Sequence, residues 1–180
     1  MINLPNFLAL IRIAIAPLMF ILLINRDLPC FEGIHTSWLD YFAALLFVIA
    51  SATDFFDGFI ARRWNQKTQL GAILDPLADK MLTLAAFLGL MMIDRASPWA
   101  VYLILTREFF ITGLRVAAVS EGKNIAASMA GKVKTVFQMI AIGFLMMNWP
   151  LATLLLWFSV GLTLYSGYEY IIGYTKKGAS

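Results

Sequence analysis

The chain has 180 residues, of which 61% are hydrophobic and only 14% are charged, and its formal net charge is +3. Soluble domains contain about 45–50% apolar and about 25% charged residues, so this composition indicates an integral membrane protein. We expect a single domain over residues 1–180. The lone cysteine excludes an internal disulfide framework, and the lone histidine, His35, excludes a histidine-rich metal site.

Six segments are apolar and long enough to cross a bilayer as helices, which takes about 20 residues each. The first contains Arg12 and has no basic segment before it, so we expect a retained helix and not a cleaved signal peptide. The sequence therefore predicts an all-α fold with six transmembrane helices, at roughly residues 5–25, 38–62, 69–93, 98–119, 130–148 and 150–174.

Local signals predict where several of these helices begin. Ser37 followed three residues later by Asp40 resembles a capping pair for the second helix. Thr68 can cap the third helix, and Pro98 suits the first position of the fourth. Pro150 is expected to separate the fifth helix from the sixth, since proline cannot continue a helix.

Lysine and arginine are distributed unevenly between the two ends of the predicted helices. One end has only Arg26 and Arg95, and the other, which includes both termini, has nine basic residues. Because cytoplasmic loops are enriched in basic residues, we expect both termini in the cytoplasm. The nine are Arg62, Arg63, Lys67, Arg115, Lys123, Lys132, Lys134, Lys176 and Lys177.

Four aspartates, Asp54, Asp57, Asp75 and Asp79, lie where the second and third helices approach the cytoplasm. A carboxylate at the bilayer centre costs roughly 2.5–3.5 kcal/mol, so four of them need compensation. Residues three or four apart share a helix face, and helices joined by a short turn pack antiparallel. The two pairs can then face each other. Their oxygens suit Mg²⁺, Mn²⁺ or Ca²⁺, and four carboxylates can hold two ions about 3.5–4 Å apart.

Small and basic residues accompany the aspartates. Gly58 and Ala61 leave room for a ligand or a neighbouring helix, and Arg62 can bind a phosphate with two hydrogen bonds. One alternative is a buried ion-pair network that includes Arg62, Lys80 and Arg107. The common face of the aspartates and the two glycines near them, Gly58 and Gly71, fit such a network poorly. Another is a cation transporter, but its acidic residues would lie near the midplane, between repeated halves.

The complete spacing resembles the signature of the CDP-alcohol phosphatidyltransferase family. These enzymes transfer a phosphatidyl or substituted phosphoryl group from a CDP-linked donor to an alcohol and release CMP. The resemblance implies a six-helix membrane protein, commonly a homodimer, with two divalent ions, Mg²⁺ or Mn²⁺, bound by the four aspartates. The signature is Asp54-x-x-Asp57-Gly58-x-x-Ala61-Arg62, eight residues, Gly71-x-x-x-Asp75-x-x-x-Asp79.

Segments outside the signature, among them residues 107–109 and 131–135, resemble the branch of the family that uses sn-glycerol 3-phosphate. This resemblance implies transfer of the phosphatidyl group of CDP-diacylglycerol at the bacterial inner membrane. It also implies that Asp79 is the general base, while Asp54, Asp57 and Asp75 hold one ion and Asp54, Asp75 and Asp79 the other. The implied CDP-diacylglycerol ligands are Asp54, Asp57, Gly58, Arg62, Thr68 and Gly71.

The acceptor carries its own phosphate and so needs cations. The fourth and fifth helices offer Arg107, Arg115, Lys132 and Lys134, and we expect Glu108 to orient Arg107. Lys132 could equally serve topology or bind lipid headgroups. Inositol phosphate, serine and phosphatidylglycerol remain open as alternative acceptors, and no nucleic-acid partner is expected.

Overall fold

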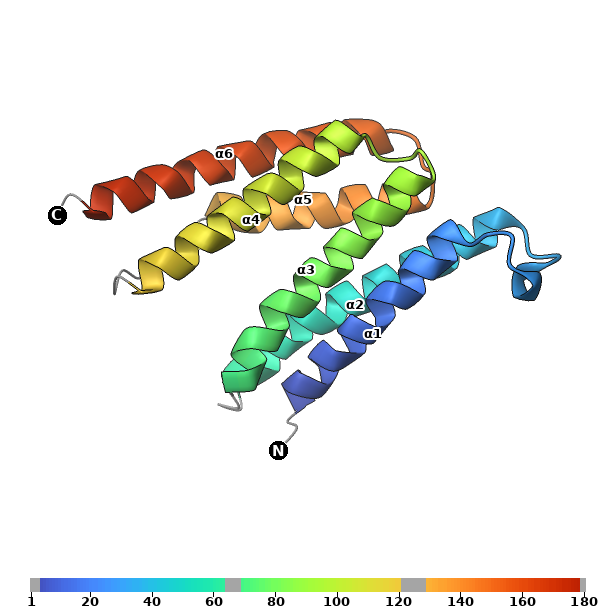
Figure 1. Ribbon diagram of the computed structural model, residues 1–180, viewed down its shortest axis with the longest axis horizontal. Helices are drawn as coiled ribbons and strands as arrows, with labels where there is room; N and C mark the ends of the chain where they lie inside the picture. Colours follow the sequence, from blue (N-terminus) through green and yellow to red (C-terminus); the bar gives the residue numbers. More distant parts are fainter. Residues whose placement is uncertain (1–3, 64–68, 121–128, 179–180) are drawn as a thin grey trace. The chain divides into compact units, whose positions relative to one another are not determined.

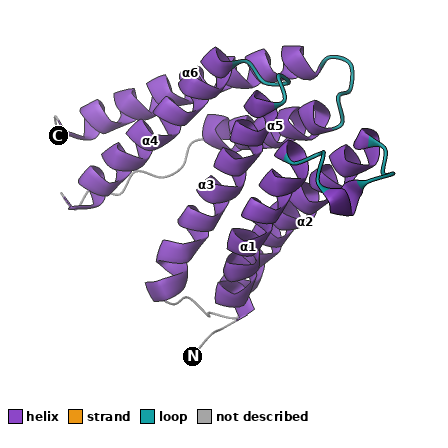
Figure 2. Cartoon of the chain, turned by 45° about the vertical axis from the view of Figure 1, so that its right-hand side comes forward, coloured by secondary structure: helices purple, strands orange, loops and turns teal. Residues whose placement is uncertain are grey.

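The computed structural model describes residues 4–63, 69–120 and 129–178. Within them every regular element is helical, as Figure 2 shows, so the predicted all-α class is confirmed. A single-turn 3-10 helix, η1 (Pro29–Phe31), accompanies six long α-helices, whose limits lie within a few residues of the predicted segments. These are α1 (Leu4–Ile24), α2 (Thr36–Arg63), α3 (Gln69–Met92), α4 (Pro98–Ser120), α5 (Met129–Met146) and α6 (Ala152–Gly178).

Three stretches of the described helices could cross a membrane, judged by length and apolar composition. They are Asn6–Ile24, Thr36–Thr53 and Met129–Met146, with mean hydropathies of 2.7, 1.3 and 1.3. Only 28–33% of each stretch is buried inside the protein. Exposed apolar surface of this extent needs an apolar surrounding, so the chain is an integral membrane protein with helical spans.

The chain forms two compact units, of which the first comprises residues 1–95 and 145–149. In it α1 packs along both α2 and α3, as Figure 1 shows. Helix α1 approaches α3 closely at Gly89, where a Cβ would lie 2.8 Å from Leu23 Cδ1. Small residues allow such close helix packing. The core includes Ala9, Ala16, Met19, Leu23, Ala43, Phe47, Ala50, Ala78, Ala86 and Phe87, each at most 3% exposed.

The second unit comprises residues 96–144 and 150–180. In it α4 packs along α6 (Figure 1), and the rings of Phe137 and Phe158 join α5 to α6 with centroids 5.0 Å apart. This core includes several polar side chains of α6, among them Ser159, Thr163 and Ser166. Its apolar members include Ala100, Val101, Ile104, Ile111, Ala118, Ala141, Ile142, Leu156 and Val160.

Two of the predicted helix boundaries are confirmed. Helix α4 begins at Pro98, where the missing N–H costs nothing because the first turn has no intrahelical partner for it. Between α5 and α6 the backbone reverses through positive φ angles, 52° at Asn148 and 67° at Leu151. The break predicted from Pro150 therefore falls where the helical hydrogen bonds stop. Thr68, the predicted cap of α3, lies outside the described residues.

The predicted capping pair at the start of α2 is wrong. Helix α2 begins at Thr36, and the carboxylate of Asp40 binds two arginines instead. Arg26 Nη2 donates to Asp40 Oδ1 and Arg95 Nη2 donates to Asp40 Oδ2, both over 2.6 Å. Hydrogen bonds between two charged groups are stronger than one from a neutral backbone N–H, so the carboxylate of Asp40 binds the arginines and does not cap the helix.

Candidate active site

The four aspartates of the signature lie at matching depths in α2 and α3. Asp57 is six residues before the end of α2, and Asp75 is six residues after the start of α3; Asp54 and Asp79 are nine and ten residues from those same ends. The two helices run antiparallel in the first unit (Figure 1). At 1.5 Å per residue, both pairs therefore lie roughly 9–15 Å along their helices from the connection.

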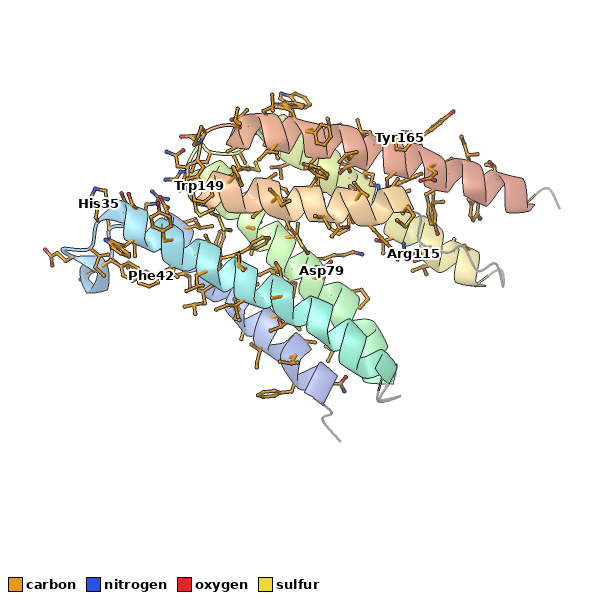
Figure 3. The ribbon with its side chains drawn as sticks, turned by 180° about the vertical axis from the view of Figure 1, so that it is seen from behind. His35, Phe42, Asp79, Arg115, Trp149 and Tyr165 are labelled. Atoms are coloured by element: carbon orange, nitrogen blue, oxygen red, sulfur yellow. The ribbon has the colours of Figure 1, made fainter. Side chains whose placement is uncertain are left out.

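Asp79 is the one member of this set whose side chain is described. It lies on α3 (Figure 3), where it is half-buried and follows the fully buried Ala78. Gly71, two turns earlier, is also buried. The side chains of Asp54, Asp57, Asp75 and Arg62, and the whole of Thr68, lie outside the described residues.

The donor set at these positions suits a hard cation. All four side chains are carboxylates, and the sequence from Asp54 to Asp79 contains no histidine or cysteine. Oxygen-only ligands favour Mg²⁺ or Mn²⁺, whereas zinc prefers nitrogen and sulfur. The sequence positions and the chemistry thus fit the predicted ions, and the arrangement of the carboxylates around them stays a prediction.

A second polar cluster lies inside the α4–α6 unit, and we call Arg107, Glu108, Lys134 and Ser166 the Glu108 cluster. Arg107 Nη1 donates to Glu108 Oε1 over 3.0 Å, and Arg107 Nη2 donates to Ser166 Oγ over 2.5 Å. Lys134 Nζ donates to the same Glu108 Oε1, and Lys134 is only 5% exposed. Two of the four predicted acceptor cations are therefore brought together by one carboxylate.

The other two predicted cations lie at the surface. Arg115, two turns after Arg107 on α4 (Figure 3), has its guanidinium carbon 6.0 Å from the centroid of the Tyr170 ring. Lys132 on α5 is exposed. Within the described part of the chain, neither of them contacts Glu108.

Sequence reasoning assigned no role to α6, although this helix supplies part of the Glu108 cluster. Its face toward the core carries Ser159, Thr163, Ser166, Gly167 and Tyr170, all of them buried. The spacing of three and four residues places them on one side of a helix. Polar residues repeating at that spacing within an apolar segment were the available signal.

Comparison with known proteins defines the class. Residues 2–165 match the family described as CDP-alcohol phosphatidyltransferase, which confirms the resemblance seen in the signature, and the chain belongs to this family. Three relatives share one name, CDP-diacylglycerol–glycerol-3-phosphate 3-phosphatidyltransferase. That of Bacillus subtilis (strain 168) is 43% identical over 181 residues, covering 94% of each chain.

Two further relatives of that name come from other bacteria. The protein of Rickettsia typhi (strain ATCC VR-144 / Wilmington) is 36% identical over 178 residues, which cover 93% of this chain and 94% of the relative. That of Escherichia coli (strain K12) is 39% identical over 150 residues, covering 80% of this chain and 76% of the relative. The similarity thus extends well beyond the aspartate signature.

Proposed function

We propose that this protein transfers the phosphatidyl group of CDP-diacylglycerol to sn-glycerol 3-phosphate, giving phosphatidylglycerol phosphate and CMP. The observation that carries this proposal is the agreement of relatives of that activity, at 36–43% identity, two of them over more than 90% of both chains. The two largely shielded cations of the Glu108 cluster, Arg107 and Lys134, support an acceptor that carries a phosphate.

The reaction is a substitution at phosphorus. A hydroxyl oxygen of the acceptor attacks the phosphorus that carries diacylglycerol, and the bond from this phosphorus to the bridging oxygen of the diphosphate breaks. CMP leaves with that oxygen. Asp79 accepts the proton of the attacking hydroxyl as general base, a role that suits its half-buried place on α3.

Asp54, Asp57 and Asp75 would hold one divalent ion, and Asp54, Asp75 and Asp79 the other. When bound, two such ions neutralise the charge of the diphosphate and of the transition state. The CDP part of the donor is bound along the same faces of α2 and α3, where glycines leave the backbone open to a ligand. We assign this binding to Asp54, Asp57, Gly58, Arg62, Thr68 and Gly71.

The acceptor's phosphate is bound by the cations of α4 and α5. Lys134 and Arg107 are shielded from solvent, with side chains 6% and 13% exposed, so their attraction for an anion is weakened little by water. Arg115 and Lys132 are exposed and form the rim of the acceptor site. Glu108 keeps the two inner cations in place when the acceptor is absent.

In the membrane, we propose that all six helices span the bilayer, with both termini and the aspartates at the cytoplasmic face of the inner membrane. Helices α3 and α4 are less apolar than α1 because α3 carries Asp75 and Asp79 and α4 carries Arg107 and Glu108. Helix α6 is less apolar than α1 because it carries the buried polar face. The excess of lysine and arginine at one end supports this orientation. As in much of the family, the working unit is a homodimer.

The purified protein, incubated with CDP-diacylglycerol and a panel of acceptors, tests the proposed activity. We expect CMP release with sn-glycerol 3-phosphate and little with serine, inositol phosphate or phosphatidylglycerol; a stronger response to another acceptor would reassign the substrate. A chelator should stop the release and Mg²⁺ or Mn²⁺ restore it. Indifference to the chelator would contradict the metal assignment, and cation uptake into liposomes without CMP release would favour a transporter.

The Asp79→Asn variant tests the general base. Removing such a group typically costs about 10²–10⁴-fold in rate, so CMP release should fall at least a hundredfold while the protein still accumulates in the membrane. Asp94→Asn, at an exposed turn after α3, is the matched control and should keep full activity. Appreciable turnover by Asp79→Asn would remove Asp79 as the base.

A further inference from the structure

We infer that Ser166 and Gly167 of α6 are positioning residues, which hold Arg107 in the orientation that the acceptor's phosphate requires. This inference rests on the proposed function, because the acceptor defines what Arg107 binds. It assigns a role to a helix that contributes nothing to the aspartate signature.

Ser166 limits the rotation of the guanidinium. Its Oγ accepts a hydrogen bond of 2.5 Å from Arg107 Nη2, and the residue is only 1% exposed, so water does not compete for the contact. Glu108 Oε1 accepts from Nη1 on the other side. The two Nη atoms are therefore held at once, which fixes the plane of the guanidinium.

Gly167 provides the space for the side chain of Arg107. A Cβ at this position would lie 3.2 Å from Arg107 Cγ and 3.3 Å from Arg107 Nε, closer than ordinary van der Waals contact. The stem of Arg107 thus crosses α6 directly over this glycine. On the same helix, Cβ atoms at Gly161 and Gly173 would meet nothing within 4 Å.

The combined contacts give each Nη atom of Arg107 a partner but leave its Nε without one among the described residues. Its Nε is buried and has no hydrogen-bond partner in the described part of the chain. A buried donor without a partner is unfavourable, and a guanidinium binds phosphate best through two adjacent N–H groups. With Nη1 and Nη2 already oriented, Nε–H is the group that an arriving phosphate oxygen can satisfy. A methyl group at Gly167 would cover it.

The test compares Gly167→Ala with Gly161→Ala, the same change on the same helix at an open position. The apparent KM for sn-glycerol 3-phosphate should rise at least tenfold in Gly167→Ala, while the KM for CDP-diacylglycerol stays within twofold. Gly161→Ala should match the unmodified protein in both. If the two variants behave alike, or if both KM values rise together, the inference is overturned.

Ser166→Ala provides a second test, which removes the hydroxyl without adding an atom. Ser166→Ala should raise the acceptor KM about threefold to tenfold, whereas Ser166→Thr, which retains a hydroxyl, should restore most of the loss. If Ser166 only packs α4 against α6, Ser166→Ala would lower the thermal unfolding midpoint in detergent without raising the acceptor KM selectively, and Ser166→Thr would restore nothing. That result would also overturn the inference.

The unmodified protein separates this inference from the proposed function. If it releases CMP with a different phosphorylated acceptor, the proposed substrate fails, and the same KM split is expected for that acceptor. If the preferred acceptor has no phosphate, or if the protein releases no CMP at all, the role given to Arg107 and its α6 contacts is wrong.

Discussion

Two carboxylates of this protein each bind two cations, but they do so in different ways. In the first unit, Asp40 gives one oxygen to Arg26 and the other to Arg95. In the second unit, both Arg107 and Lys134 donate to the same oxygen of Glu108.

The remaining contacts of Arg26 and Arg95 also differ from those of Arg107. Arg26 Nε donates to the carbonyl of Leu23 over 3.0 Å, and Arg95 Nη1 donates to the carbonyl of Met146 over 2.6 Å. Asp40, Arg26 and Arg95 therefore connect the start of α2 with the end of α1, the segment after α3 and the end of α5. By contrast, Arg107 Nε stays buried with no hydrogen-bond partner in the described residues.

The comparison teaches how to distinguish a structural ion cluster from a binding one when the residue types are the same. Donors that bond main-chain carbonyls are committed to holding segments together, because those carbonyls would otherwise be unpaired at helix ends. A donor that the protein leaves unused can pair with a ligand. Of the two clusters, the one around Asp40 should therefore contribute mainly to the stability of the fold, and the Glu108 cluster mainly to substrate binding.

The largest effect is expected from Asp40→Ala. It leaves two largely buried arginines without a counter-charge, and breaking such a pair costs about 3–5 kcal/mol. The thermal unfolding midpoint in detergent should fall sharply, while the folded protein keeps its KM values at low temperature. Asp27→Ala, in the exposed loop beside Arg26, is the control and should leave the midpoint unchanged. A selective rise in the acceptor KM at normal stability would abolish the distinction between the two clusters.

Lys134→Ala should affect substrate binding next most strongly. A hydrogen bond to a charged group is worth about 1.5–3 kcal/mol, so the apparent KM for sn-glycerol 3-phosphate should rise about tenfold to a hundredfold. The KM for CDP-diacylglycerol should change much less. Steady-state kinetics with each substrate varied in turn measures both. An equal rise in the two values would argue against a separate acceptor site.

A double-mutant cycle between Glu108 and Lys134 should give a smaller, coupled effect. Glu108→Gln keeps an acceptor oxygen but removes the charge, and Lys134→Ala removes the donor. Residues in direct contact couple by about 0.5–3 kcal/mol, so the two changes in acceptor kcat/KM should fall short of additivity by about 1 kcal/mol. Strict additivity would mean that the contact does not contribute to the site in the working enzyme.

The smallest effect is expected from Lys132→Ala. Lys132 is exposed and two residues from Lys134, which puts it on a different face of α5. Exposed charges contribute about 0–1 kcal/mol, so the acceptor KM should change less than about fivefold. A loss as large as that of Lys134→Ala would mean that the exposed rim of the acceptor site contributes as much as its buried cations.

The sequence by itself determined the features that depend on local properties. Helix length follows from apolar runs, the start of α4 from Pro98 and the break before α6 from Pro150, because these residues act on their own backbone. The signature that Asp54, Asp57, Asp75 and Asp79 form with Gly58, Ala61, Arg62 and Gly71 was enough to indicate the family, because it can be read from the sequence without knowing how the helices pack.

Only the tertiary structure decided which polar side chains meet. Asp40 binds Arg95 across 55 residues of chain, and Arg107 binds Ser166 across 59. Such pairs depend on which helix faces pack together, and many faces of apolar helices are chemically similar. The local spacing of Ser37 and Asp40 therefore gave a wrong prediction of a helix cap, and no local pattern predicted a role for the polar face of α6.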